Sequence, residues 1–205
     1  MIRSMDGVLQ MGILYARVLL KNGQYAAADK LLSNLTVIPF EGATLSHELY
    51  RQTKLMECVD ALKREQAKAA LNFAQQAKEW PENLGVGKPY PENIDERLEN
   101  WFIYSCYNAM HRQDKANAML DSVITDSKNV MTSDKYFTNS IITAWAFKQL
   151  KKDEDGIKWL GNESSNYSDK NIAAWIIKPD IHNLPSSLND REKTNASVIN
   201  SLGQQ

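Results

Sequence analysis

The sequence predicts an all-α fold, an α-solenoid of antiparallel helix pairs, and two observations carry this prediction. Glycine and proline, which interrupt helices, number only 9 and 6 among 205 residues. Apolar residues recur at helical spacing along most of the chain, in stretches that come in pairs. The 43% hydrophobic content is enough for a core, and the 24% charged content is that of an ordinary globular protein.

We expect four helix pairs followed by a capping region. In the first pair, residues 6–39, Asn22-Gly23 ends one helix and Pro39 follows the other. The other pairs are expected at residues 45–81, 94–125 and 133–160. The capping region, 161–205, is expected to end in a helix that Asn189-Asp190 caps and Gly203 stops. We interpret residues 1–205 as a single helical-repeat domain belonging to a larger polypeptide.

The pairs share a register. A small residue stands near the start of each second helix: Ala28, Ala70, Ala116 and Gly156. Twelve residues earlier stand Ala16, Cys58, Tyr104 and Ala144, and nine residues earlier stand Leu19, Ala61, Tyr107 and Phe147. Four residues later stand Leu32, Ala74, Leu120 and Leu160. Small residues let helices approach closely, so we expect the three alanines of the first set to be buried between paired helices.

This register resembles the tetratricopeptide repeat, with a large, a small and an aromatic residue in the first helix, alanine and a bulky residue in the second, and then proline. The resemblance covers about residues 8–160 and is clearest at residues 109–120. Three features depart from the family pattern. The intervals of 42, 46 and 40 residues exceed the family's period of about 34, Gly23 is the only glycine at a turn between paired helices, and Tyr104 replaces a small residue.

A narrower resemblance lies at residues 80–90, Trp-Pro-Glu-Asn-Leu-Gly-Val-Gly-Lys-Pro-Tyr. This segment is similar to one found in bacterial repeat proteins that carry an uncharacterised β-sandwich domain associated with carbohydrate metabolism. The resemblance implies that the chain is the helical repeat region of such a protein.

The segment from Glu82 to Asn93 is predicted to be ordered, because its prolines reduce the entropy lost on folding. We expect Leu84 and Tyr90 to pack onto adjacent helices, and Asn83 and Asn93 to bond to nearby backbone. Gly85-Val86-Gly87-Lys88 is not interpreted as a phosphate-binding loop, because Pro89 stands where a serine or threonine is needed.

Composition and spacing exclude several classes of function. The net charge of −1 argues against a nucleic-acid partner, and no apolar stretch is long enough to span a membrane. The histidines are isolated from one another, so we expect no metal, no cofactor and no catalytic activity. Cys58 and Cys106 are interpreted as buried thiols, with a single disulfide as the alternative. We expect a soluble protein. The compartment stays open between the cytoplasm and an exported location, since an export signal could precede these residues.

Two tryptophans, Trp101 and Trp145, fall on first helices, which line the concave groove of tetratricopeptide arrays. The predicted binding residues on this face are Arg17, Trp101, Ser105, Asn108, Trp145 and Lys148. Aromatic and cationic groups suit a peptide or a sugar. In the competing interpretation, the two tryptophans only fill the interface between neighbouring pairs.

We therefore expect a non-catalytic scaffold that binds a protein, a peptide or another domain of its own polypeptide. The alternative is a helical accessory domain of a carbohydrate-metabolism protein, which contacts glycan or supports a catalytic domain.

Overall fold

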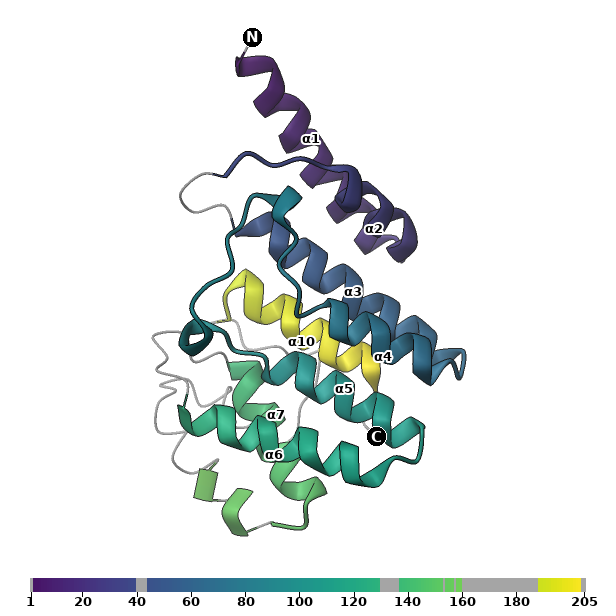
Figure 1. The fold of residues 1–205 in the computed structure, drawn as a ribbon, viewed down its shortest axis with the longest axis vertical. Helices are drawn as coiled ribbons and strands as arrows, with labels where there is room; N and C mark the ends of the chain where they lie inside the picture. Colours follow the sequence, from purple (N-terminus) through teal and green to yellow (C-terminus); the bar gives the residue numbers. More distant parts are fainter. Residues whose placement is uncertain are drawn as a thin grey trace. The chain divides into compact units, whose positions relative to one another are not determined.

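The computed structural model describes residues 2–39, 44–129, 137–152, 154–156, 158–159 and 188–203. All regular structure in these ranges is helical, and no strand occurs there (Figure 1). The predicted all-α class is confirmed. The elements are α1 (Ile2–Lys21), α2 (Tyr25–Asn34), α3 (Leu45–Lys63), α4 (Ala67–Gln76), η1 (Glu82–Leu84), η2 (Pro91–Asn93), α5 (Arg97–Ala109), α6 (Gln113–Asn129), α7 (Phe137–Gln149) and α10 (Asp190–Leu202).

The chain divides into two compact units, Met1–Pro89 and Tyr90–Gln205. In the first unit, α1 packs on α2, α2 packs on α3, and α3 packs on α4. In the second unit, α5 packs on α6, both contact α7, and α10 also packs on α7. Consecutive helices are therefore the principal packing partners in each unit, as a series of helical hairpins requires.

Burial confirms the predicted register at every described position except Tyr107, which is partly buried. Ala28, Ala70 and Ala116 each have 0% exposure. The residues twelve positions earlier are also buried, and so are the described residues four positions later: Ala16, Cys58, Tyr104 and Ala144, then Leu32, Ala74 and Leu120. Leu160 lies outside the described residues. A Cβ atom added to Gly156 would lie 3.2 Å from the Cβ of Phe147, so this position accommodates little more than glycine.

The four turns between paired helices share one backbone conformation. The residue five positions before the small residue has a left-handed φ in every case: 70° at Gly23, 60° at Glu65, 56° at His111 and 57° at Lys151. The N–H of the next residue donates to the carbonyl five residues back, at 2.8–2.9 Å, in the bonds Gln24–Leu19, Gln66–Ala61, Arg112–Tyr107 and Lys152–Phe147. The left-handed residue donates to the carbonyl three residues back, at 2.9–3.1 Å. This is the Schellman arrangement, and three of the four turns adopt it without glycine.

The non-glycine turns yield a stability prediction. Because side chains other than glycine are disfavoured at left-handed φ, Glu65→Gly and His111→Gly are each expected to stabilise the chain by about 0.5–1 kcal/mol. Both side chains are exposed, so their removal costs little packing. Urea unfolding measures the change. Gly23→Ala is the reciprocal control and should destabilise. A loss of stability in Glu65→Gly would contradict this account of the turn.

The segment that follows α4 is built into the first unit. Asn83 Nδ2 donates to the carbonyls of Leu32 at 3.0 Å and Leu35 at 2.8 Å, and so caps the C-terminal end of α2. The N–H of Val37 donates to Asn83 O at 2.8 Å, and Ser46 Oγ donates to Leu84 O at 2.8 Å. The expected burial of Leu84 and the backbone bonding of Asn83 are both confirmed.

The expected packing of Tyr90 is wrong, because its side chain is 74% exposed. Pro91 favours extended backbone at the preceding residue, and Tyr90 has φ −61° and ψ 145°. The turn is closed by the N–H of Asn93, which donates to Tyr90 O at 2.9 Å, so it needs no contribution from the ring.

At the C-terminal end, the predicted cap is confirmed. Asn189 Oδ1 accepts from Glu192 N at 2.9 Å, and Glu192 Oε2 accepts from Asn189 N at 3.0 Å. This reciprocal pair is a capping box. Gly203 follows α10 with a φ of 82°, which agrees with its predicted role as the helix stop.

Candidate binding surfaces

The structure brings together part of the predicted groove. The rings of Trp101 on α5 and Trp145 on α7 are 5.5 Å apart, centroid to centroid, and Trp101 also meets Tyr104 at 4.9 Å. Trp101 is only 7% exposed, whereas Trp145 is partly buried. The aromatic contact therefore joins neighbouring hairpins, as in the interpretation that competes with the binding groove.

The other predicted groove residues have different surroundings. Ser105 is buried, and its Oγ donates to Trp101 O at 3.0 Å. Asn108 is half-buried and Lys148 is exposed. Their backbone carbonyls accept hydrogen bonds from the left-handed residues of the turns that follow. Arg17 is exposed on α1 in the first unit. A ligand role for this set stays a prediction.

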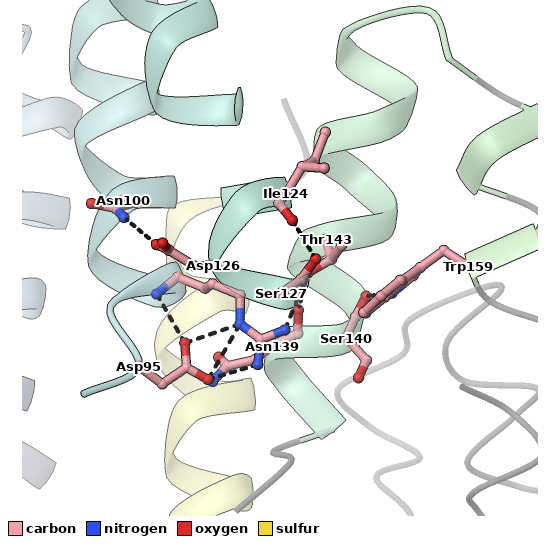
Figure 2. Close-up of polar contacts among 10 residues, drawn as sticks. Asp95, Asn100, Ile124, Asp126, Ser127, Asn139, Ser140, Thr143 and Trp159 are labelled. Carbon is pink, nitrogen blue, oxygen red and sulfur yellow. Dashed lines mark hydrogen bonds and ion pairs between the residues drawn. The ribbon is translucent and has the colours of Figure 1, made fainter. Parts of the chain in front are cut away.

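A buried ion pair that the sequence analysis missed connects the start of α5 to α7. Asp95 accepts from Arg97 Nε at 3.0 Å and from Arg97 Nη2 at 2.7 Å, and it also accepts from Asn139 Nδ2 at 2.6 Å. Arg97 Nη1 donates to Thr143 Oγ1 at 3.4 Å. Figure 2 shows Asp95, Asn139 and Thr143 converging from α7 and from the residues that precede α5. The pair thus fixes α7 against the start of the preceding hairpin.

The charge state of Asp95 follows from these contacts. Burial on its own would raise the pKa of this carboxyl group, but hydrogen bonds and the charge of Arg97, together with the Asn139 amide, outweigh that effect. The pKa of Asp95 is therefore lowered from its ordinary value. The ionised form contributes stability that is present above the unfolded pKa and is lost as the pH falls through the folded pKa.

Further polar contacts surround this ion pair (Figure 2). Asn100 Nδ2 on α5 donates to Asp126 Oδ2 on α6 at 3.2 Å. Trp159 Nε1 donates to Ser140 O on α7 at 3.3 Å. These bonds run between helices of the second unit and satisfy buried polar groups, so we interpret the network as structural.

The first unit contains a second buried charge cluster, centred on Lys54. Its ammonium lies 2.7 Å from Asp29 Oδ1 on α2 and 3.2 Å from Glu57 Oε2 on α3. It also lies 5.5 Å from the ring centroid of Phe73 on α4. Burial raises the pKa of Glu57, because Lys54 offsets only part of the desolvation and Asp29 adds repulsion. One lysine therefore ties three helices together.

A polar cleft of about 360 Å³ lies beside this cluster, lined in part by Tyr50, Gln76 and Asn83. The hydroxyl of Tyr50 donates to Glu79 Oε2 at 3.3 Å. Burial is the main cause that raises the pKa of Tyr50, and the negative charge of Glu79 raises it further. Nearby, the rings of His47 and Trp80 stack, with their centroids 3.5 Å apart. The charged groups at the cleft are engaged with one another, so the cleft is best explained as the surface of an ion-pair cluster. The available sequence signal was Lys54, a charge one turn from both Tyr50 and Cys58.

The most distinctive surface is an apolar stripe on α1. Four side chains at helical spacing are exposed: Met11 at 67%, Leu14 at 56%, Tyr15 at 56% and Val18 at 43%. They are separated by three, four and seven residues from Met11, so they share one face of the helix. The opposite face carries Ala16, Leu19 and Leu20, which are buried in the core of the first unit. We call these four exposed residues the α1 stripe.

Metal-ligand groups, disulfides and membrane-spanning helices are all absent from the described ranges. Those ranges hold no group of three or more His, Cys, Asp or Glu side chains that could bind a metal ion. Cys58 and Cys106 are both buried, as expected, and no disulfide joins them. In the part of the chain that the structure describes, no helix is long and apolar enough to cross a membrane. The chain matches no protein-family model, no curated protein and no solved structure.

Proposed function

We propose that the chain is a non-catalytic, tetratricopeptide-like module whose helical hairpins stack as a solenoid and bind another protein. The recurring turn and the buried small residues support the repeat architecture, because the same local design is used four times. Arrays of this kind present helix faces to partners and need no catalytic residues.

The observation that carries the binding function is the α1 stripe. Isolated exposed apolar residues are common on proteins, but contiguous apolar patches mark interaction sites. The stripe has one aromatic and three aliphatic side chains over two helical turns, which is the anchor pattern of helix-mediated protein contacts.

The alternative, an accessory domain in carbohydrate metabolism, is supported by the sequence resemblance at residues 80–90. In the structure, Asn83 and Leu84 of this segment cap α2 and fill the core of the first unit. These structural roles explain Asn83 and Leu84 without any contact to a glycan. We therefore favour the protein-binding proposal.

Affinity capture from extracts of the source organism, quantified by mass spectrometry, tests the proposed function. The wild-type chain is expected to enrich a defined set of proteins that Leu14→Glu/Val18→Glu loses by at least about tenfold, because a buried charge costs binding energy. Ala27→Glu, an exposed change on α2, is the matched control and should retain the set. Equal capture by all three proteins would refute the proposal.

A further inference from the structure

The common register shows what the α1 stripe corresponds to in other hairpins. Ala28 and Gly156 hold the same register position and are 128 residues apart, so each residue of the stripe has an equivalent 128 positions later. These equivalents lie on α7 and are Asn139, Ile142, Thr143 and Ala146. All four are buried, at 2%, 0%, 0% and 0% exposure. Asn139 and Thr143 contact Asp95 and Arg97, at the start of the preceding hairpin (Figure 2).

The second hairpin of the first unit agrees in part. With the 42-residue offset between Ala28 and Ala70, Met11 and Tyr15 correspond to Thr53 and Glu57 of α3, which are buried. Leu14 and Val18 correspond to Met56 and Asp60, which are partly exposed. Glu57 shares the Lys54 ammonium with Asp29 of α2, in the preceding hairpin. The same helix face therefore packs against the preceding hairpin along its length in α7 and at part of its length in α3.

Charge specifies the partner further. Arg17 and Lys21 are exposed and stand three residues after Leu14 and Val18, so they border one side of the α1 stripe. Residues 10–21 contain no acidic side chain to neutralise them. A partner that covers the stripe must bring its own negative charge to this edge.

We propose that the α1 stripe receives an amphipathic helix of a partner, with apolar residues along its centre and acidic residues along one edge. This helix would occupy the place that a preceding hairpin holds against α3 and α7. The inference rests on the proposed function and names the class of partner that the surface fits. A second copy of this chain is disfavoured, because antiparallel pairing of two α1 helices brings two basic edges and no acidic one.

Two synthetic peptides test the inference by fluorescence anisotropy. Each is an 18-residue helix with leucines along one face, and one edge carries glutamates in the first peptide and lysines in the second. The acidic peptide is expected to bind the wild-type chain and to lose at least about tenfold in affinity to Leu14→Glu. Arg17→Glu/Lys21→Glu should reverse the preference and favour the basic peptide. Ala27→Glu is the control, and circular dichroism checks that each variant is folded.

Several results would overturn the inference. Equal binding of the two peptides would show that charge plays no part in recognition. Binding that Leu14→Glu leaves unchanged would show that the α1 stripe is not the binding surface. A dimer seen in sedimentation and abolished by Leu14→Glu would make a second copy the occupant. If capture from extracts depends on the stripe but the acidic peptide does not bind, the proposed function stands and this partner class is wrong.

Discussion

Replacing Arg97 by methionine is expected to lower the free energy of unfolding by about 3–5 kcal/mol at neutral pH, because Asp95 then stays buried without its counter-charge. The Arg97 side chain is 4% exposed and that of Asp95 is 10% exposed, so solvent screens neither charge effectively. Methionine fills much of the arginine volume, which limits the part of the loss that a cavity would cause. Urea unfolding of the two proteins measures the difference.

The effect should depend on pH in a defined direction. In the wild-type chain the pKa of Asp95 is lowered, so its contribution to stability is lost only as the pH falls below about 4. In Arg97→Met, burial without a cation raises this pKa instead, and protonation relieves the penalty. The difference between variant and wild type should therefore shrink as the pH falls from 7 towards 4.

A matched surface pair provides the control for Arg97→Met. Arg64 Nη2, just after the end of α3, lies 3.3 Å from Asp60 Oδ2 on α3, and the two side chains are 68% and 37% exposed. Arg64→Met should cost no more than about 1 kcal/mol, as is usual for exposed ion pairs. Equal losses in Arg64→Met and Arg97→Met, or a pH-independent loss in the latter, would show that burial of the Asp95 pair is not the cause.

Gly85→Ala is expected to destabilise the chain by about 2–5 kcal/mol, through left-handed strain and overpacking. Gly85 has a φ of 68°, and an added Cβ would lie 2.5 Å from the carbonyl oxygen of Val37. That contact is with backbone that Asn83 already holds by a hydrogen bond, so it cannot relax by rotation of a side chain. Thermal or urea unfolding measures the loss.

Gly87 is the natural control for Gly85, because it lies two residues away in the same segment and an added Cβ would meet nothing within 4 Å. Gly87→Ala should therefore change stability by less than about 0.5 kcal/mol. A similar loss in both variants would indicate that the whole segment depends on glycine flexibility and not on the approach to Val37.

The sequence predicted the helices and their register well, because both depend on local periodicity. Ala28, Ala70 and Ala116 could be identified as contact positions since small residues at equal offsets from large ones recur in each pair. The turns were harder to predict. Among these turns, only Gly23 has a residue type that predicts a left-handed conformation. Glu65 and His111 adopt that conformation because the hydrogen bonds of the hairpin require it.

The polar clusters could not be predicted, since they join residues distant in sequence. Asp95 meets Asn139 across 44 positions, and Asp29 meets Lys54 across the connection between two hairpins. The α1 stripe posed the opposite difficulty. Met11, Leu14, Tyr15 and Val18 have the spacing of core residues, and periodicity does not tell a face buried in its own domain from one left for a partner.

The left-handed turns have a consequence for what the sequence of such a hairpin must contain. At Glu65, His111 and Lys151 the requirement is a backbone conformation, which several residue types can adopt and glycine adopts with the least strain. The hairpin therefore depends on the interval of five residues between the left-handed position and the small residue more than on which residue occupies the turn.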